Sequence, residues 1–163
     1  MKKLGLDATD IRILGAVQEH GQLSKARLAE IANLSPTPCW TRLRRLKEAG
    51  LIRGYRGDIA LEQICDFTQV VVTVSLRYHG KTDFDRFEAF VHERDEITDC
   101  VSTGGGMDYV LMTISPNLSS FQSLMQAMQD PELGVDRYMT YIATRNVKAS
   151  RPNLEKLTAA ADL

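Results

Sequence analysis

The side chains with the clearest chemical pattern are threonines and arginines that share one face of a predicted helix in the first third of the chain. At about 100° per residue, Thr37, Thr41 and Arg44 gather on one side, while Cys39 and Leu46 gather opposite them. An arginine can bind guanine O6 and N7 together, and a threonine can bind a base edge or contact the methyl group of thymine. This face therefore predicts a helix that enters the major groove of duplex DNA.

Further side chains around this face suit the phosphate backbone, because cations at the flanks of such a helix lie beside phosphates rather than bases. Trp40 has two interpretations: a wedge against the sugar-phosphate backbone, or packing over the surface of the domain. For the arginines taken alone, an amphipathic helix with a solvated basic face is the alternative. The predicted DNA-contacting residues are Lys25, Ser35, Pro36, Thr37, Trp40, Thr41, Arg42, Arg44, Arg45 and Lys47.

Two shorter helices precede this one and must position it. Asp7 can begin the first, whose apolar residues recur at helical spacing up to Gly21, and Ser24 can cap the second. A tight turn over residues 33–35 leads into the third helix, where Pro36 takes the first helical position that proline favours. Two short helices joined by such a turn are typical of a helix-turn-helix unit.

Pro38 changes the start of the third helix. It has no N–H group, so we expect Ser35 to cap the helix through the N–H of Thr37 instead. Gly50 is placed to end the helix after Ala49.

The charge of the chain is strongly asymmetric, although its net value is only −1. Residues 1–56 carry 11 positive and 5 negative side chains, a net charge of +6, and the remainder carries 9 positive and 16 negative, a net charge of −7. Such asymmetry indicates a polyanionic partner for the basic segment. Chance clustering on solvated faces is the alternative.

The remainder of the chain alternates between strand and helix patterns. Valines at every second position over residues 69–76 predict a half-buried strand, and aromatic residues at helical spacing follow around Phe87. The order βαββαβ is the ferredoxin-like split motif, so we expect an α+β fold with a three-helix helix-turn-helix domain in front. The other predicted elements are an extended linker strand over 51–60, strands over 97–103 and 109–114, a helix opened by Pro116-Asn117, a long strand over 135–147, and one helical turn or a frayed end over 154–157.

A glycine-rich loop joins two of these strands and is a candidate ligand site. Consecutive glycines expose backbone N–H groups that suit a carboxylate, and a neighbouring Asp108 can accept a hydrogen bond from an ammonium group. An α-amino acid carries both groups; the alternative is a flexible hairpin loop with a capping aspartate. The predicted effector-binding residues are Thr103, Gly104, Gly105, Gly106, Met107, Asp108 and Arg145.

Catalytic and metal chemistry is not indicated. The three cysteines, Cys39, Cys65 and Cys100, and the three histidines lack metal-ligand spacing, and no nucleophile elbow or phosphate loop is present. No apolar run approaches the ~18 residues of a membrane span, and no signal-peptide pattern follows the first residues. We therefore expect no catalytic residue, no metal, no cofactor and no membrane partner, and we expect a cytoplasmic protein.

Taken together, these motifs resemble those of the Lrp/AsnC regulators, the leucine-responsive or feast/famine transcription factors. The resemblance runs from about residue 6 to Lys148 and implies a helix-turn-helix domain followed by a ferredoxin-like domain that senses amino acids. It rests on Leu6-Asp7-x-x-Asp10-x-x-Ile13-Leu14, Leu28-Ala29-Glu30, Leu34-Ser35-Pro36-Thr37-Pro38-Cys39-Trp40-x-Arg42-Leu43-Arg44-Arg45-Leu46 and Gly50-Leu51-Ile52-Arg53-Gly54-Tyr55, with Gly105-x-x-Asp108-Tyr109 and Val147-Lys148 further on.

The sequence departs from the family pattern around the glycine loop. Gly106 stands where the family usually has an acid, Met107 replaces an aromatic residue, and Arg145-Asn146 replace a common acidic pair. These changes indicate a different effector, more anionic than usual or not a standard amino acid; a pocket that binds nothing is the alternative. An enzyme on the same scaffold, such as the sirohaem decarboxylases that resemble this family, and a standalone amino-acid-binding module are the other two functions considered.

The resemblance also implies how the chain is divided and assembled. We expect a helix-turn-helix domain over residues 1–52, a linker over 53–68, an effector-sensing and oligomerisation domain over 69–150, and a tail over 151–163. The expected partners are double-stranded DNA, a small amino-acid-like ligand, and further copies of the chain, as a homodimer and an octamer of four dimers. The expected location is a bacterial or archaeal cytoplasm, in association with the nucleoid.

Overall fold

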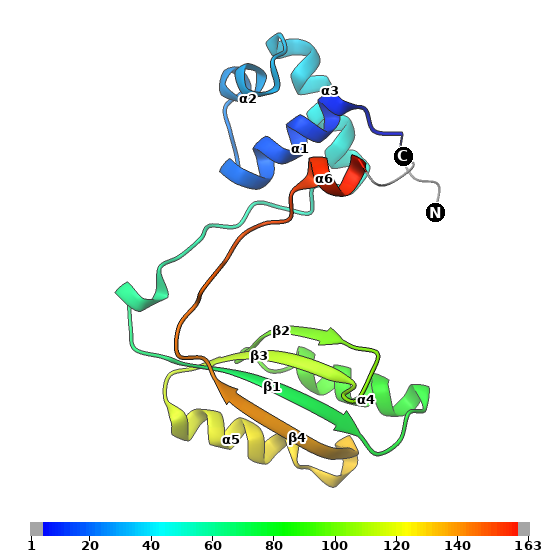
Figure 1. Cartoon of the computed structure of the whole chain (residues 1–163), viewed down its shortest axis with the longest axis vertical. Coiled ribbons are helices and arrows are strands. Elements are labelled where there is room, and N and C mark those ends of the chain that lie inside the picture. Colours follow the sequence, from blue (N-terminus) through cyan, green and yellow to red (C-terminus); the bar gives the residue numbers. More distant parts are fainter. Residues whose placement is uncertain (1–4, 160–163) are drawn as a thin grey trace. The chain divides into compact units, whose positions relative to one another are not determined.

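The computed structural model describes residues 5–159, which form two compact units (Figure 1). The first, called the head here, contains the residues up to Ile59 together with those from Lys148 onward, and the second, called the body, spans Ala60–Val147. Two stretches of chain therefore connect the units, one in each direction. Within the described part, no helix is long and apolar enough to cross a membrane.

The head is built on three helices, α1 (Ala8–His20), α2 (Lys25–Ala32) and α3 (Pro36–Glu48). The Asp7 side chain accepts a hydrogen bond from the backbone N–H of Asp10 and begins α1, and the Ser24 side chain caps α2 through the N–H of Arg27. Both capping bonds satisfy N–H groups that have no partner within the helix. The buried core of the three helices consists of Ile13, Ala16, Leu28, Ala29, Ala32, Cys39, Leu43 and Leu46.

The two ends of α3 differ in how they are closed. The expected cap by Ser35 is wrong, because the Ser35 side chain makes no capping hydrogen bond. A capping oxygen binds the N–H of the second or third helical residue; the third is Pro38, and the remaining N–H of Thr37 is not used. At the other end Gly50 has a φ of +72°, and its N–H donates to the carbonyl of Lys47 over 2.9 Å. This left-handed glycine ends the helix as expected.

The segment after α3 forms no strand, which corrects the strand expected over residues 51–60. Residues 52–60 have no regular secondary structure, and a short 3-10 turn follows at Leu61–Gln63. A strand needs a neighbour for its backbone N–H and C=O groups, and within one chain this segment has none.

The body contains β1 (Thr68–Leu76), α4 (Lys81–His92), β2 (Ile97–Ser102), β3 (Tyr109–Ser115), α5 (Leu118–Met128) and β4 (Val135–Ile142). The strands form one sheet in the order β2-β3-β1-β4, and all neighbours are antiparallel. This confirms the α+β class and the ferredoxin-like order βαββαβ.

The last strand is shorter than the one expected over residues 135–147. Its partner β1 begins at Thr68, and the final contacts are the pairing of Val70 with Ile142 and a hydrogen bond from the N–H of Ala143 to the carbonyl of Gln69. Beyond this point no strand lies alongside, so the chain leaves the sheet.

The sheet has one covered and one open face. Helices α4 and α5 pack on the first face, as Figure 1 shows, and form the core of the body with the inward residues of β1 and β3. Along β1 the covered side chains Val70, Val72 and Val74 alternate with the partly exposed Val71 and Thr73. Neither helix of the body covers the other face of the sheet.

The tail forms the short helix α6 (Leu154–Ala159), which packs against α1. Residues 148–159 thus belong to the head, whereas the stretch up to residue 150 was expected to complete the sensing domain. Positions 160–163 of the expected tail lie outside the described residues, as do positions 1–4 of the expected helix-turn-helix domain.

Candidate nucleic-acid interface and effector loop

The outward face of α3 carries the residues expected to read bases. Thr37, Thr41 and Arg44 are exposed, while Cys39 and Leu43 on the opposite side are buried. The Thr41 hydroxyl donates to the carbonyl of Thr37 over 3.1 Å, which fixes its direction along the helix. The Arg44 side chain is 70% exposed and meets only the exposed Glu48 carboxylate, at 3.5 Å. Arg44 is therefore free to reach a partner at little cost, since exposed pairs of this kind contribute little.

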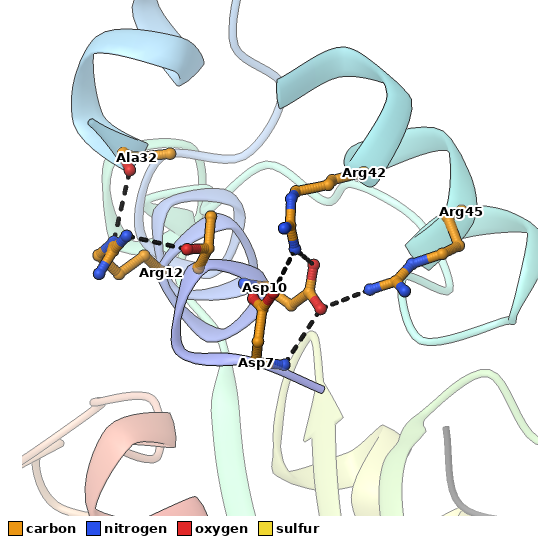
Figure 2. A network of polar contacts seen from close by, with 7 residues as sticks. Asp7, Asp10, Arg12, Ala32, Arg42 and Arg45 are labelled. Atoms are coloured by element: carbon orange, nitrogen blue, oxygen red, sulfur yellow. Dashed lines mark hydrogen bonds and ion pairs between the residues drawn. The ribbon is translucent and has the colours of Figure 1, made fainter. Parts of the chain in front are cut away.

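Arg42 and Arg45, by contrast, are bound to carboxylates at the start of α1 (Figure 2). The Arg42 Nη1 atom lies 2.6 Å from Asp7 Oδ2 and 2.9 Å from Asp10 Oδ1, and Arg45 donates to the other Asp10 oxygen. Asp10 is only 1% exposed, so these guanidinium groups compensate a buried charge. The network joins the first helix to the third.

The electrostatics of this network are visible in two pKa values. The backbone N–H of Asp10, and then the hydrogen bond from Arg42, hold the pKa of Asp7 below its ordinary value. The hydrogen bonds from Arg42 to Asp7 and to Asp10 raise the pKa of its guanidinium. Both shifts favour the charged forms. Sequence reasoning missed the network, although the spacing Asp7-x-x-Asp10 is that of a capping box.

A second cluster of cations lies on aromatic rings. The Nζ atom of Lys25, the first residue of α2, lies 4.4 Å from the centroid of the Trp40 ring. Lys47 Nζ lies 6.0 Å from the same ring and 4.9 Å from the ring of Tyr55. The indole is 38% exposed. The structure thus brings together three of the predicted DNA-contacting residues from two helices.

The glycine loop lies between β2 and β3, and all three glycines are exposed. Gly105 has a φ of +149°, a conformation that side chains disfavour. The loop is closed by a hydrogen bond from the N–H of Thr103 to the carbonyl of Asp108, at 2.8 Å. Met107, which follows the glycines, is partly buried. Backbone N–H groups are therefore presented on a short, closed turn.

Asp108 is already engaged within the chain. Its Oδ2 atom accepts a hydrogen bond from the N–H of Leu76 over 2.7 Å, and its Oδ1 atom lies 3.1 Å from Nε2 of His79. The carboxylate thus ties the loop to the end of β1. This favours a structural role in shaping the loop over the expected role as a free acceptor for a ligand.

The basic residue beside the loop is Arg137 and not Arg145. Arg137 lies near the start of β4 and donates to the carbonyl of Gly106 over 3.1 Å. Arg145 follows the far end of β4, because β4 runs antiparallel to β1 and ends opposite Val70. Within one chain the structure does not bring Arg145 to the loop. Sequence reasoning missed Arg137 because its contact with Gly106 joins residues 31 positions apart.

Two of the three cysteines, Cys39 and Cys100, have thiols shielded from solvent. Burial raises the pKa of the Cys39 thiol, and burial with Glu88 and Asp99 nearby raises the pKa of the Cys100 thiol to about 11. Both thiols are therefore protonated at neutral pH. Among the described residues no group of His, Cys, Asp or Glu side chains is placed to hold a metal ion.

The fold and the basic face define a DNA-binding regulator with a separate ligand-binding domain, and comparison with known proteins specifies its family. A winged helix-turn-helix DNA-binding model matches residues 6–53, and the Lrp/AsnC ligand binding domain matches residues 69–153. The chain belongs to the Lrp/AsnC family of transcriptional regulators.

Relatives of known name and structure agree with this assignment. The transcriptional regulatory protein DoeX of Halomonas elongata is 40% identical over 143 residues, which cover 88% of this chain and 90% of DoeX. The leucine-responsive regulatory protein of Escherichia coli is 32% identical, with 89% and 88% of the two chains covered. A transcriptional regulator of Neisseria meningitidis, solved as a complex with L-Met, is 30% identical with a TM-score of 0.81, over 90% of this chain and 94% of that one. These relatives are regulators, and the chain is a transcriptional regulator.

Proposed function

We propose that the chain binds double-stranded DNA with α3 in the major groove and reads sequence mainly through Arg44, Thr37 and Thr41. The observation that carries this proposal is their exposure on one face of α3, within a segment of net charge +6. In helix-turn-helix proteins the corresponding helix contacts base edges. The first turn of α3, from Ser35 to Thr37, is exposed as well, and the Ser35 hydroxyl is left without a capping bond and can bind a phosphate.

The remaining cations divide into two roles. Lys25, Lys47 and the half-exposed Arg45 are placed for phosphates, whereas Arg42 is only about one-third exposed and holds α1 against α3. Arg42 is therefore proposed as a residue that positions the helix rather than one that contacts DNA.

The proposed regulator of DNA binding is a small amino-acid-like molecule at the glycine loop. Support comes from the exposed backbone of Gly104–Gly106, from the nearby guanidinium of Arg137, and from the related N. meningitidis regulator whose structure contains L-Met. An extra cation and a missing acid favour an effector that is more anionic than a plain amino acid. In an assembly, Arg145 of a neighbouring copy supplies a further cation.

The proposed assembly is a homodimer formed through the open face of the sheet, and further association of four dimers into an octamer. Two α3 helices related by twofold symmetry match a pseudo-palindromic site with half-sites about one helical turn apart. Effector binding between copies would then change the spacing of the heads and hence DNA affinity. The proposed location is the cytoplasm, at the nucleoid.

The test of the proposed function measures binding of the full chain to duplex fragments from its own genomic neighbourhood. We expect the protein to retard a specific fragment in a gel-shift experiment. The logarithm of the binding constant should fall linearly with the logarithm of the salt concentration, with a slope of about −0.9 for each phosphate neutralised. Calorimetry with amino acids and their acidic derivatives, followed by light scattering, tests the effector and the assembly. Failure to retard any duplex at low salt contradicts DNA binding; lack of heat with every ligand contradicts only the effector.

A further inference from the structure

We propose that Trp40 is a positioning residue that holds the ammonium groups of Lys25 and Lys47 for contact with DNA phosphates, and does not itself contact DNA. This inference rests on the proposed DNA binding and deepens it. The geometry behind it is the row formed by the Lys25 ammonium, the Trp40 ring, the Lys47 ammonium and the Tyr55 ring, with separations of 4.4, 6.0 and 4.9 Å.

The position of Lys25 requires a compensating partner. Lys25 is the first residue of α2, where the helix dipole and the free N–H groups disfavour a positive charge. The Ser24 side chain satisfies the N–H of Arg27, and no carboxylate in the described residues pairs with Lys25. The face of an indole attracts a cation. Trp40 is therefore the group that keeps the Lys25 ammonium at this place rather than dispersed in solvent.

Lys47 is held on the same side of α3, two turns further along. Its ammonium lies between the rings of Trp40 and Tyr55, and no carboxylate in the described part of the chain pairs with it. A ring compensates charge without accepting the N–H bonds in the way that a carboxylate does. Both lysines thus keep all their donors for an anion, whereas Arg42 donates to both Asp7 and Asp10 and Arg45 donates through one nitrogen to Asp10.

The surroundings of the Trp40 ring favour a positioning role over direct contact between the ring and DNA. The indole is 38% exposed, and an ammonium already lies 4.4 Å from its centroid. A ring that carries a cation is not an open platform for a base or a sugar. The effect of Trp40 on DNA binding must then pass through Lys25 and Lys47. A positioning role therefore predicts that the loss caused by replacing Trp40 depends on these lysines, whereas direct contact with DNA predicts that it does not.

The experiment is a double-mutant cycle on the full chain with a labelled specific duplex and a random duplex. We expect Trp40→Leu to weaken both complexes by about 5- to 30-fold, which corresponds to two exposed cation–π contacts, because phosphates carry no sequence information. In the Lys25→Ala/Lys47→Ala background the same change should cost less than about 2-fold. Trp40→Phe should retain most of the affinity.

Matched controls keep the result interpretable. Lys81 also begins a helix, α4, and takes part in none of the cation–π contacts found among the described residues, which involve Lys25, Lys47 and Arg94. Lys81→Ala therefore removes one charge outside the row and should leave affinity unchanged. Circular dichroism and thermal unfolding of each variant check the fold. An equal loss from Trp40→Leu in both backgrounds, or no loss at all, would overturn the proposal.

A second measurement needs no DNA. Trp40 is the only tryptophan in the chain, so fluorescence excited selectively at tryptophan reports on this ring alone. Lys25→Ala should shift the emission of the free protein, and Lys81→Ala should not; identical spectra for Lys25→Ala and the parent chain would contradict the contact itself. If the parent chain binds no duplex, the proposed function fails while the fluorescence result still decides the Lys25–Trp40 contact.

Discussion

At the scale of single residues, the cations of the head differ in how they are compensated. Arg42 and Arg45 face the carboxylates of Asp7 and Asp10, whereas Arg44 is largely exposed beside Glu48. Replacement of Arg44 should therefore change the sequence specificity of DNA binding. Replacement of Arg42 or Arg45 should instead weaken the packing of α1 against α3.

We expect Arg44→Ala to cost about 1–3 kcal/mol of binding free energy on the specific duplex and much less on a random one, as for loss of a bidentate contact to a guanine. Competition binding against duplexes with single base changes measures both. Arg27→Ala is the control, because Arg27 is an exposed arginine that is paired with Glu30 on α2 and is not among the residues predicted to contact DNA. An equal loss on all sequences would reassign Arg44 to the phosphates.

Asp7→Asn should lower the melting temperature in a manner that depends on pH. The folded pKa of Asp7 lies below its ordinary value, so its contribution to stability is present above about pH 4 and disappears as the pH falls through the lowered pKa. The difference in melting temperature between parent and variant should thus be measurable at pH 7. It should disappear at strongly acidic pH. Asp58→Asn, at an exposed position after α3, is the control; a difference that persists in acid would contradict the ion pair.

At the scale of elements, the last turn of α3 is closed by a left-handed glycine and backbone hydrogen bonds. Gly50 has a φ of +72°, and Leu51 donates to the carbonyl of Leu46, so the last carbonyls of the helix are satisfied. Gly15, in the middle of α1, has an ordinary helical conformation and open space where a Cβ atom would lie. The same substitution should have opposite effects at these two glycines.

Gly50→Ala should destabilise the head by about 1 kcal/mol, because a left-handed conformation disfavours a Cβ atom. Gly15→Ala should stabilise it by roughly 0.5–1 kcal/mol, because alanine loses less backbone entropy in a helix. Urea unfolding followed by circular dichroism measures both. Equal signs for the two variants would show that the end of α3 does not depend on the left-handed glycine.

Sequence patterns predicted those structural features that depend on residues close together in the sequence. The valine alternation in β1, the proline at the start of α3 and Gly50 at its end all act within a few residues, and the structure agrees with them. Features set by contacts between distant segments were missed. The end of β4 depends on where β1 begins, and the engagement of Asp108 depends on the N–H of Leu76.

The candidate site follows the same division. Helical periodicity alone separated the exposed face of α3, with Arg44, from the buried one. The binding of Arg42 to Asp7 and Asp10, by contrast, joins residues more than 30 positions apart, which no spacing within one helix reveals. The predicted contacts to DNA and to effector therefore stay predictions, with Arg137 as an addition.

At the scale of the whole molecule, the open face of the sheet carries apolar side chains that the body itself leaves partly exposed. Register places Met112 and Tyr141 on either side of Val71, and Met139 beside Thr73. Met139 and Tyr141 are about half exposed. A second copy packed on this face would bury these side chains, in agreement with the proposed dimer.

Met112→Asp should therefore convert the proposed dimer to a monomer. An uncompensated buried charge costs about 3–5 kcal/mol, which weakens association more than a hundredfold. Light scattering at micromolar concentration measures the mass. The control is Gln126→Asp, which adds the same charge on the exposed side of α5, away from the open face, and should leave the mass unchanged. If the Met112→Asp chain keeps the parent's mass, the dimer does not form through the open face.

The packing of α6 on α1 means that the DNA-binding end of the molecule is not one uninterrupted piece of polypeptide. A fragment that stops at residue 59 omits α6, and its stability will understate that of the intact head. A protease nick between residues 143 and 153 leaves the head joined to the body through the earlier connector and held to α6 by packing alone. Such a product should migrate as one species under native conditions and as two in denaturant.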